Sequence, residues 1–138
     1  MKKKRIIFML GAVLLAGCTA KPVTENKDGS TTLHIKIMDE VNDKQLLDDE
    51  VTVEEPVESL AGFLEASDLD AVLEDSSYGK TIMGLMGVET KDFDRGPWWV
   101  YESEDNDSCI ETGVCDACSS LPIESGDHFT FTYKDSFD

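Results

Sequence analysis

The sequence is poor in basic residues, which excludes two classes of partner. Its 138 residues include 12 Lys and Arg against 29 Asp and Glu, so the formal net charge at pH 7 is −17. Nucleic acids and anionic lipid surfaces are bound through basic patches. Four of the basic residues lie at positions 2–5, which leaves the rest of the chain more acidic still. We therefore expect no nucleic-acid partner; the acidity serves solubility or attracts cations.

The sequence also lacks the short motifs of common catalytic sites. It contains no G-x-S-x-G nucleophile turn, no H-E-x-x-H zinc motif and no glycine loop of the kind that cradles phosphate. We therefore predict that the protein is not an enzyme.

A membrane-spanning segment is missing as well, because the apolar run at 6–16 is shorter than the roughly 20 residues that a bilayer needs. A basic start, a short apolar core and small residues before a cleavage point are typical of a secretory signal peptide. Leu15-Ala16-Gly17-Cys18 is similar to a bacterial lipobox. We predict a signal peptide at 1–17 and a diacylglyceryl group on Cys18; a membrane anchor and a signal cut elsewhere are the alternatives.

Lipidation of Cys18 would hold the protein at the extracytoplasmic face of the cell membrane, because two acyl chains anchor stably where one does not. The polar segment 18–30 has no apolar periodicity and is typical of a flexible tether. Residues 31–138 remain, enough for one modest domain with a single core.

The first part of this domain has the pattern of a β-hairpin followed by a helix. From Thr31 onward polar residues alternate with an apolar face of Leu33, Ile35 and Ile37, as in a half-buried strand. A turn at 41–43 leads to a second, antiparallel strand at 51–53. After Pro56, a helix opens at 58–60, with Glu58 in its first turn and an apolar face of Leu60, Phe63 and Leu64. Residues 69–73 extend this face or begin a crossover.

The second part has three strand-like segments. The glycines at 79, 84 and 87 argue against a helix at 78–88 and indicate a strand with bends. A turn at Gly96-Pro97 precedes the aromatic strand 98–101. In the last strand, 128–133, one face carries Phe129, Phe131 and Tyr133. Strands, one helix and more strands predict an α+β fold with a small mixed sheet packed on the helix.

The order of these motifs resembles a known family. The glycine-rich segment 82–88, the Trp-x-x-Tyr of 98–101 and the segment 123–133 with its Gly-Asp pair occur in this order in the transcobalamin C-terminal-like domain of unknown function of Firmicute lipoproteins. The resemblance covers about residues 31–138. It implies a β-grasp-like fold, in which a sheet curls around one helix. In transcobalamin and intrinsic factor the similar domain caps a corrinoid, so the resemblance also implies a corrinoid-like ligand.

Three cysteines follow Cys18 with the spacing C-x5-C-x2-C: Cys109, Cys115 and Cys118. Disulfides persist outside the cytoplasm, and an odd count leaves one thiol over. One interpretation is a disulfide from Cys109 to Cys115 or Cys118 that pins the loop. A second is a zinc site of three thiolates, with His128, Asp116 or water as fourth ligand. A third is a redox-active pair at 115 and 118.

Two further groups carry ligand-type side chains. The acidic run Glu102, Glu104, Asp105 and Asp107 is either a solvated loop or a set of oxygen ligands for calcium, although it does not follow the EF-hand spacing. In the aromatic strand Trp99 and Tyr101 share one face and Trp98 takes the other, so one face is core and the other is a stacking platform for a flat ligand or a glycan. His34 and His128 are interpreted as ordinary strand residues.

These features lead to one functional hypothesis and two rivals. We predict a surface-anchored lipoprotein that binds a small ligand or a metal ion through the region 98–127, the candidates being a divalent metal such as zinc and a corrinoid. The first rival is an adaptor for protein–protein interaction with a disulfide-pinned loop. The second is a surface redox protein.

Overall fold

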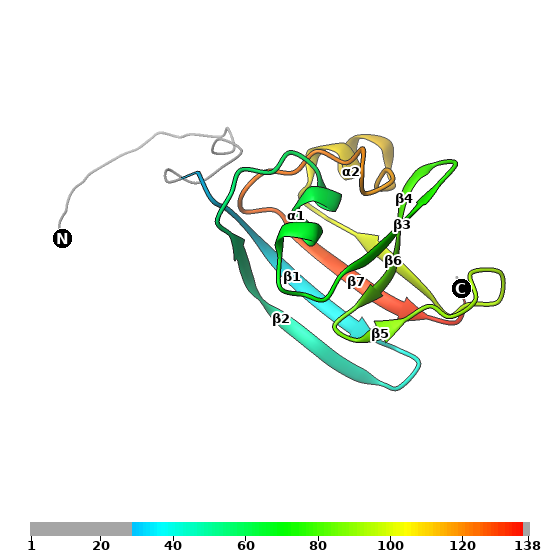
Figure 1. Cartoon of the computed structure of the whole chain (residues 1–138). Coiled ribbons are helices and arrows are strands. Elements are labelled where there is room, and N and C mark those ends of the chain that lie inside the picture. Colours follow the sequence, from blue (N-terminus) through cyan, green and yellow to red (C-terminus); the bar gives the residue numbers. More distant parts are fainter. Residues whose placement is uncertain (1–28, 137–138) are drawn as a thin grey trace.

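The structure, a computed structural model, describes residues 29–136. The predicted signal peptide, Cys18 and most of the tether lie outside these residues. Residues 29–136 form an α+β fold of two sheets and two short helices (Figure 1), which confirms the fold class predicted from the sequence. No helix in this part of the chain is long and apolar enough to cross a membrane.

The larger sheet is mixed and has the strand order β2-β1-β7-β6. β1 (Thr31–Asp39) and β2 (Lys44–Val53) form the predicted antiparallel hairpin. β7 (His128–Lys134) pairs in parallel with β1, and β6 (Trp98–Glu102) pairs antiparallel with β7. The first and last strands of the described chain are therefore neighbours at the centre of the sheet.

The smaller sheet has the order β3-β4-β5. Its strands are β3 (Val72–Ser76), β4 (Gly79–Leu85) and β5 (Val88–Glu89), with a turn between β4 and β5 where Met86 and Gly87 both have positive φ. The predicted bent strand is thus two strands and a turn. The helices are α1 (Leu60–Ala66) and α2 (Asp107–Thr112).

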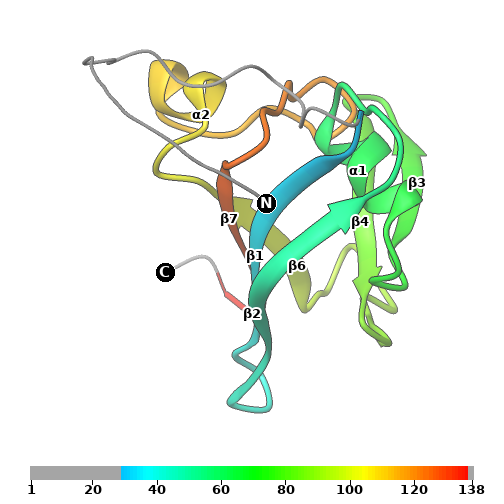
Figure 2. The ribbon, with the colours of Figure 1, turned by 90° about the vertical axis from the view of Figure 1, so that its left-hand side faces the viewer.

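One core lies between the inner face of the larger sheet and α1. The strands contribute Leu33, Ile35, Ile37, Phe129 and Phe131, and α1 adds Leu60, Phe63 and Leu64 to the same cluster. In Figure 2, α1, β3 and β4 lie together on one side of the larger sheet, whereas α2 lies at the upper end of the sheet and leaves most of the other side open. We call that side the outer face. Because side chains alternate along a strand, it carries the polar set predicted for β1, including His34 and Lys36.

Ser59 fixes the start of α1. Its side chain accepts a hydrogen bond from the Gly62 backbone N–H at 3.1 Å, as an N-cap does. Ser59→Ala should therefore lower the free energy of unfolding by about 1 kcal/mol, measured by urea denaturation, whereas Ser59→Thr should keep most of it. An unchanged urea midpoint in the alanine variant would show that packing alone sets the helix start.

Several predicted boundaries are wrong. Glu58 precedes the helix instead of lying in its first turn, and α1 ends at Ala66, so residues 72 and 73 open β3. β2 begins at Lys44, not at residue 51, because its pairing with β1 continues through the acidic residues of β2. These residues do not alternate with apolar ones, so the sequence pattern did not predict this part of the strand. α2 was not predicted, since Cys109 is its one buried residue and no apolar period marks it.

Candidate functional site

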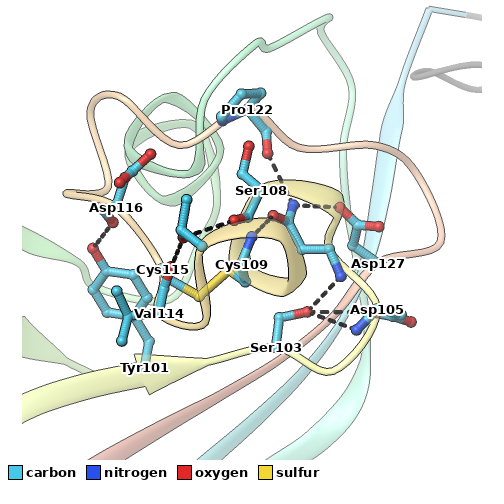
Figure 3. Close-up of a disulfide and its surroundings, with 12 residues drawn as sticks. Tyr101, Ser103, Asp105, Ser108, Cys109, Val114, Cys115, Asp116, Pro122 and Asp127 are labelled. Atoms are coloured by element: carbon cyan, nitrogen blue, oxygen red, sulfur yellow. Dashed lines mark hydrogen bonds between the residues drawn. A yellow bond between two sulfur atoms is a disulfide. The ribbon is translucent and has the colours of Figure 1, made fainter.

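A disulfide joins Cys109, in α2, to Cys115, in the loop that follows (Figure 3), with Cα atoms 4.2 Å apart. Gly113 ends the helix in a left-handed conformation (φ 83°), and its N–H donates to the Cys109 carbonyl. This turn brings the chain back so that the two cysteines meet. The disulfide interpretation is confirmed, with Cys115 as the partner.

Cys118 keeps a free thiol and is fully buried. Its Sγ lies 3.2 Å from the Lys80 carbonyl oxygen, to which it donates. Burial raises the pKa of the Cys118 thiol, so it stays protonated near neutral pH.

The predicted zinc site of three thiolates is therefore not assembled. Two of its sulfurs are bonded to each other, the third is turned toward a backbone carbonyl, and His128 is hydrogen-bonded to Asp105. In residues 29–136 no group of three or more His, Cys, Asp or Glu side chains is arranged to hold a metal ion. The acidic run therefore does not form the predicted calcium site either.

The acidic run is instead divided among different structural tasks. Asp105 accepts hydrogen bonds from Ser103 and His128, and Asp107 lies in the first turn of α2, where a negative charge suits the helix dipole. Burial would raise the pKa of Asp105, but the hydrogen bonds from the His128 backbone and ring and from Ser103 outweigh it and lower that pKa. Glu102 ends β6 and Glu104 is exposed.

Asn106 connects α2 to the rest of the domain through three side-chain hydrogen bonds. The residue is 2% exposed, and its side-chain oxygen accepts from the Cys109 N–H at 3.1 Å. Its amide nitrogen donates to the Pro122 carbonyl at 2.9 Å and to the Asp127 carboxylate at 2.8 Å. One buried amide thus caps the helix, holds the following loop and satisfies a buried carboxylate. The role of Asn106 was not predicted from the sequence, although an Asn followed seven residues later by Gly is a signal for the two ends of a helix.

The aromatic strand is used mainly inside the protein. Trp99 is 6% exposed and donates its ring N–H to the Val88 carbonyl, so its face of the strand is the core face and Trp99 is not available as a stacking platform. Trp98 faces the other way, but its ring lies over Gly96, where an added Cβ would come within 2.6 Å, and donates to the Phe93 carbonyl. Tyr101 donates its hydroxyl to the Asp116 carbonyl at 2.6 Å. Burial first, and then the nearby Cys118 and Asp116, raise the pKa of Tyr101, which keeps that hydroxyl a donor.

Two surface hollows run along the outer face where β6 and β7 meet. The first, of about 500 Å³, is lined by Glu102, Ser103, Glu104, Asp105, His128 and Thr130. The second, of about 530 Å³, is lined by Glu40, Val100, Tyr101, Glu102, Val114, Thr130, Thr132 and Lys134. Because they share Glu102 and Thr130, we describe them together as the outer groove.

A third hollow of about 320 Å³ separates the end of β6 from the disulfide loop and is also lined by Glu102. Glu102 is therefore common to all three hollows. Of the predicted aromatic platform, Tyr101 lines the second and third hollows, whereas Trp98 and Trp99 line none of the three.

At one end of the outer groove the chain's two histidines face each other. His34 and His128 are paired across β1 and β7, and their rings stack with centroids 4.9 Å apart. His34 Nε2 lies 2.6 Å from the Asp48 carboxylate, and His128 Nδ1 lies 2.7 Å from that of Asp105. Interpreting both as ordinary strand residues missed this cluster, because it depends on a register that the sequence does not reveal.

No family model and no curated protein matches the sequence. Two solved structures are similar. A candidate metal-binding protein from Ruminococcus gnavus has a TM-score of 0.58 at 17% identity, over 78% of this chain and 99% of that protein. Haptocorrin in complex with Cbi has a TM-score of 0.53 at 17% identity, over 82% of this chain and 27% of haptocorrin. The chain therefore has a distant transcobalamin-like fold, as the resemblance of its motifs implies.

Proposed function

We propose that the domain binds a small cationic ligand or a metal ion in the outer groove, and that the lipid on Cys18 presents it at the extracytoplasmic face of the membrane. The observation that carries the proposal is the convergence of the three hollows on Glu102. The hollows lie between two constrained elements, which are the paired strands β6 and β7 and the loop held by the Cys109–Cys115 disulfide. Binding sites are generally concave and preformed in this way.

The charge of the lining sets the ligand class. The outer groove has four carboxylates, from Glu40, Glu102, Glu104 and Asp105, and one lysine, Lys134. A net negative lining attracts cations and repels anions. The two tryptophans that would stack on a flat corrinoid make other contacts, so among the ligand classes inferred from the sequence the groove favours a cation. The carboxylates would attract such a cation by their summed charge and bind it partly through water, because no three of the described acidic side chains surround one point.

The two similar structures support binding rather than catalysis as the role of this fold. One is described as a candidate metal-binding protein and the other as a complex with Cbi. A binding function also agrees with the absence of catalytic motifs from the sequence.

Glu102→Gln should weaken binding at the groove, because it removes the one carboxylate common to the three hollows without changing side-chain size. The probe is Mn²⁺, which prefers oxygen ligands, titrated into the purified protein and followed by its electron paramagnetic resonance signal. We expect the dissociation constant to rise about fivefold, as for the loss of one solvent-screened charge contact.

Glu74→Gln is the matched control, since Glu74 is an exposed carboxylate on the smaller sheet. It should bind Mn²⁺ like the unmodified protein. A parallel titration with a cobinamide, followed by its visible absorbance, tests the corrinoid. If neither probe binds, or if both variants weaken Mn²⁺ equally, the proposed groove function is wrong.

A further inference from the structure

We infer that His34 and His128 together form a binding site for a divalent transition metal such as Ni²⁺ or Cu²⁺. The site adjoins the outer groove through His128 but does not depend on binding there. It goes beyond the proposed function because it selects a different class of ion by nitrogen ligands.

The neighbouring carboxylates determine where the protons lie on the two histidine rings. An ionised carboxylate only accepts hydrogen bonds, so the ring nitrogen that faces it must carry the hydrogen. Asp48 faces Nε2 of His34, and Asp105 faces Nδ1 of His128. In the neutral rings the lone pairs are therefore on Nδ1 of His34 and on Nε2 of His128.

These two lone pairs have no hydrogen-bond donor among the described residues. Neither Nδ1 of His34 nor Nε2 of His128 makes a hydrogen bond or ion pair with any residue in the described range 29–136. Both side chains reach solvent, with 34% of His34 and 62% of His128 exposed. Two adjacent imidazoles thus present acceptor nitrogens and no matching donor.

Each histidine ring is held by a carboxylate that accepts its other N–H. Histidines that bind metals almost always donate their other ring N–H to a carboxylate or a carbonyl, which fixes the tautomer and makes the ligand more basic. Both rings have this carboxylate support. Asp105 is itself positioned by Ser103 and by the His128 backbone N–H at 2.9 Å, so the support of His128 is anchored on two sides.

The two rings are close enough to bind the same ion. The two residues are direct neighbours on parallel strands and point to the same face. With metal–nitrogen bonds of about 2.0–2.1 Å, two ligand nitrogens of one ion lie about 3 Å apart. The rings stack at 4.9 Å with 24° between their planes, so they must turn toward one another to share an ion. The carboxylates of Asp48 and Asp105 must move with the rings to keep their support, and both are 41% exposed. Water completes the coordination.

The ligand type sets the selectivity. Imidazole suits Ni²⁺, Cu²⁺ and Zn²⁺, whereas Ca²⁺, Mg²⁺ and Mn²⁺ prefer oxygen, and Cu²⁺ binds most tightly in the divalent series. Around the pair, Glu50 on β2 is the cross-strand neighbour of His34 and adds negative charge on the same face.

The test uses the fact that the chain has two histidines and both belong to this site. Ni²⁺ is titrated into the purified protein, and the two imidazole C2–H signals are followed by proton NMR alongside calorimetry. We expect one ion per chain and simultaneous broadening of both signals. His34→Ala and His128→Ala should each weaken Ni²⁺ binding by about tenfold or more, and Asp48→Asn by about tenfold through the lost carboxylate support.

Two controls separate this site from the outer groove. Glu74→Gln should leave Ni²⁺ binding unchanged, and His34→Ala should leave Mn²⁺ binding unchanged, because His34 does not line the groove. Ni²⁺ binding that survives His34→Ala would overturn the site while leaving the groove proposal intact. Mn²⁺ binding that Glu102→Gln leaves unchanged would have the opposite meaning, since it would overturn the groove proposal and leave the histidine site intact.

Discussion

Asn106→Asp is expected to destabilise the domain by about 3–5 kcal/mol at neutral pH, the usual cost of an uncompensated buried charge. The new oxygen would replace the amide nitrogen that donates to Asp127 and to the Pro122 carbonyl. Asp127 is fully buried, so two carboxylates would face each other with little water between them. Urea denaturation monitored by tryptophan fluorescence measures the loss, since Trp99 is a core residue.

The pH dependence gives this prediction a second readout. Repulsion in the folded state raises the pKa of the introduced carboxyl above its unfolded value. A raised folded pKa means that the penalty is present above that pKa and is relieved as the pH falls through it. The gap in stability between the variant and the unmodified protein should therefore narrow at acidic pH.

Asn42→Asp is the matched control for this substitution. Asn42 also donates its amide N–H to an aspartate, Asp39, at 2.8 Å, but Asn42 itself is exposed in the β1–β2 turn. Solvent screens the new charge there, and the loss should stay within about 1 kcal/mol. Equal losses in the two variants would mean that burial is not what makes Asn106 important.

Replacing Cys109 and Cys115 together by serine is expected to lower the free energy of unfolding by about 2 kcal/mol. The bridge closes a short loop, with a sequence separation of 6, so its entropic effect is at the lower end for disulfides. The loop that carries Val114 and the Asp116 carbonyl should also become mobile. Hydrogen exchange at 113–116 should rise more than exchange in β1 or β7.

Reductant supplies the internal control for the double serine variant. Dithiothreitol should lower the urea midpoint of the unmodified protein toward that of the variant and leave the variant unchanged. If reductant has no effect on the unmodified protein, the disulfide does not stabilise it. Cys118 needs no separate control in this comparison, because its thiol is free in both proteins.

The sequence predicted the elements whose side chains alternate between core and solvent. β1 and β7 are such strands, and the period of Leu33, Ile35 and Ile37 identifies the buried face directly. α1 was predicted from Leu60, Phe63 and Leu64 because the helix is amphipathic. In each of these elements the residues that the local apolar pattern marks are the residues that tertiary packing buries.

The elements that were missed have little buried surface of their own. β3 exposes most of its residues and α2 buries one, so neither carries an apolar period. The candidate site was missed for a different reason. The positions of His34, His128 and Asp105 depend on the parallel register of β1 and β7 and on the loop after β6, neither of which follows from local sequence. The three cysteines formed a plausible zinc pattern, but the turn at Gly113 brings two of them into a bond instead.

The central pairing of β1 with β7 also determines when this domain can fold. Paired residues such as His34 and His128 stand 94 positions apart. Contacts between such distant residues close late and slowly, because the chain between them must be ordered first. During synthesis β1 leaves the ribosome long before its partner exists, so the nascent chain has no stable sheet to build on. The domain therefore lacks its central strand pair until β7 has been synthesised, and this delay suits the export across the membrane that we propose.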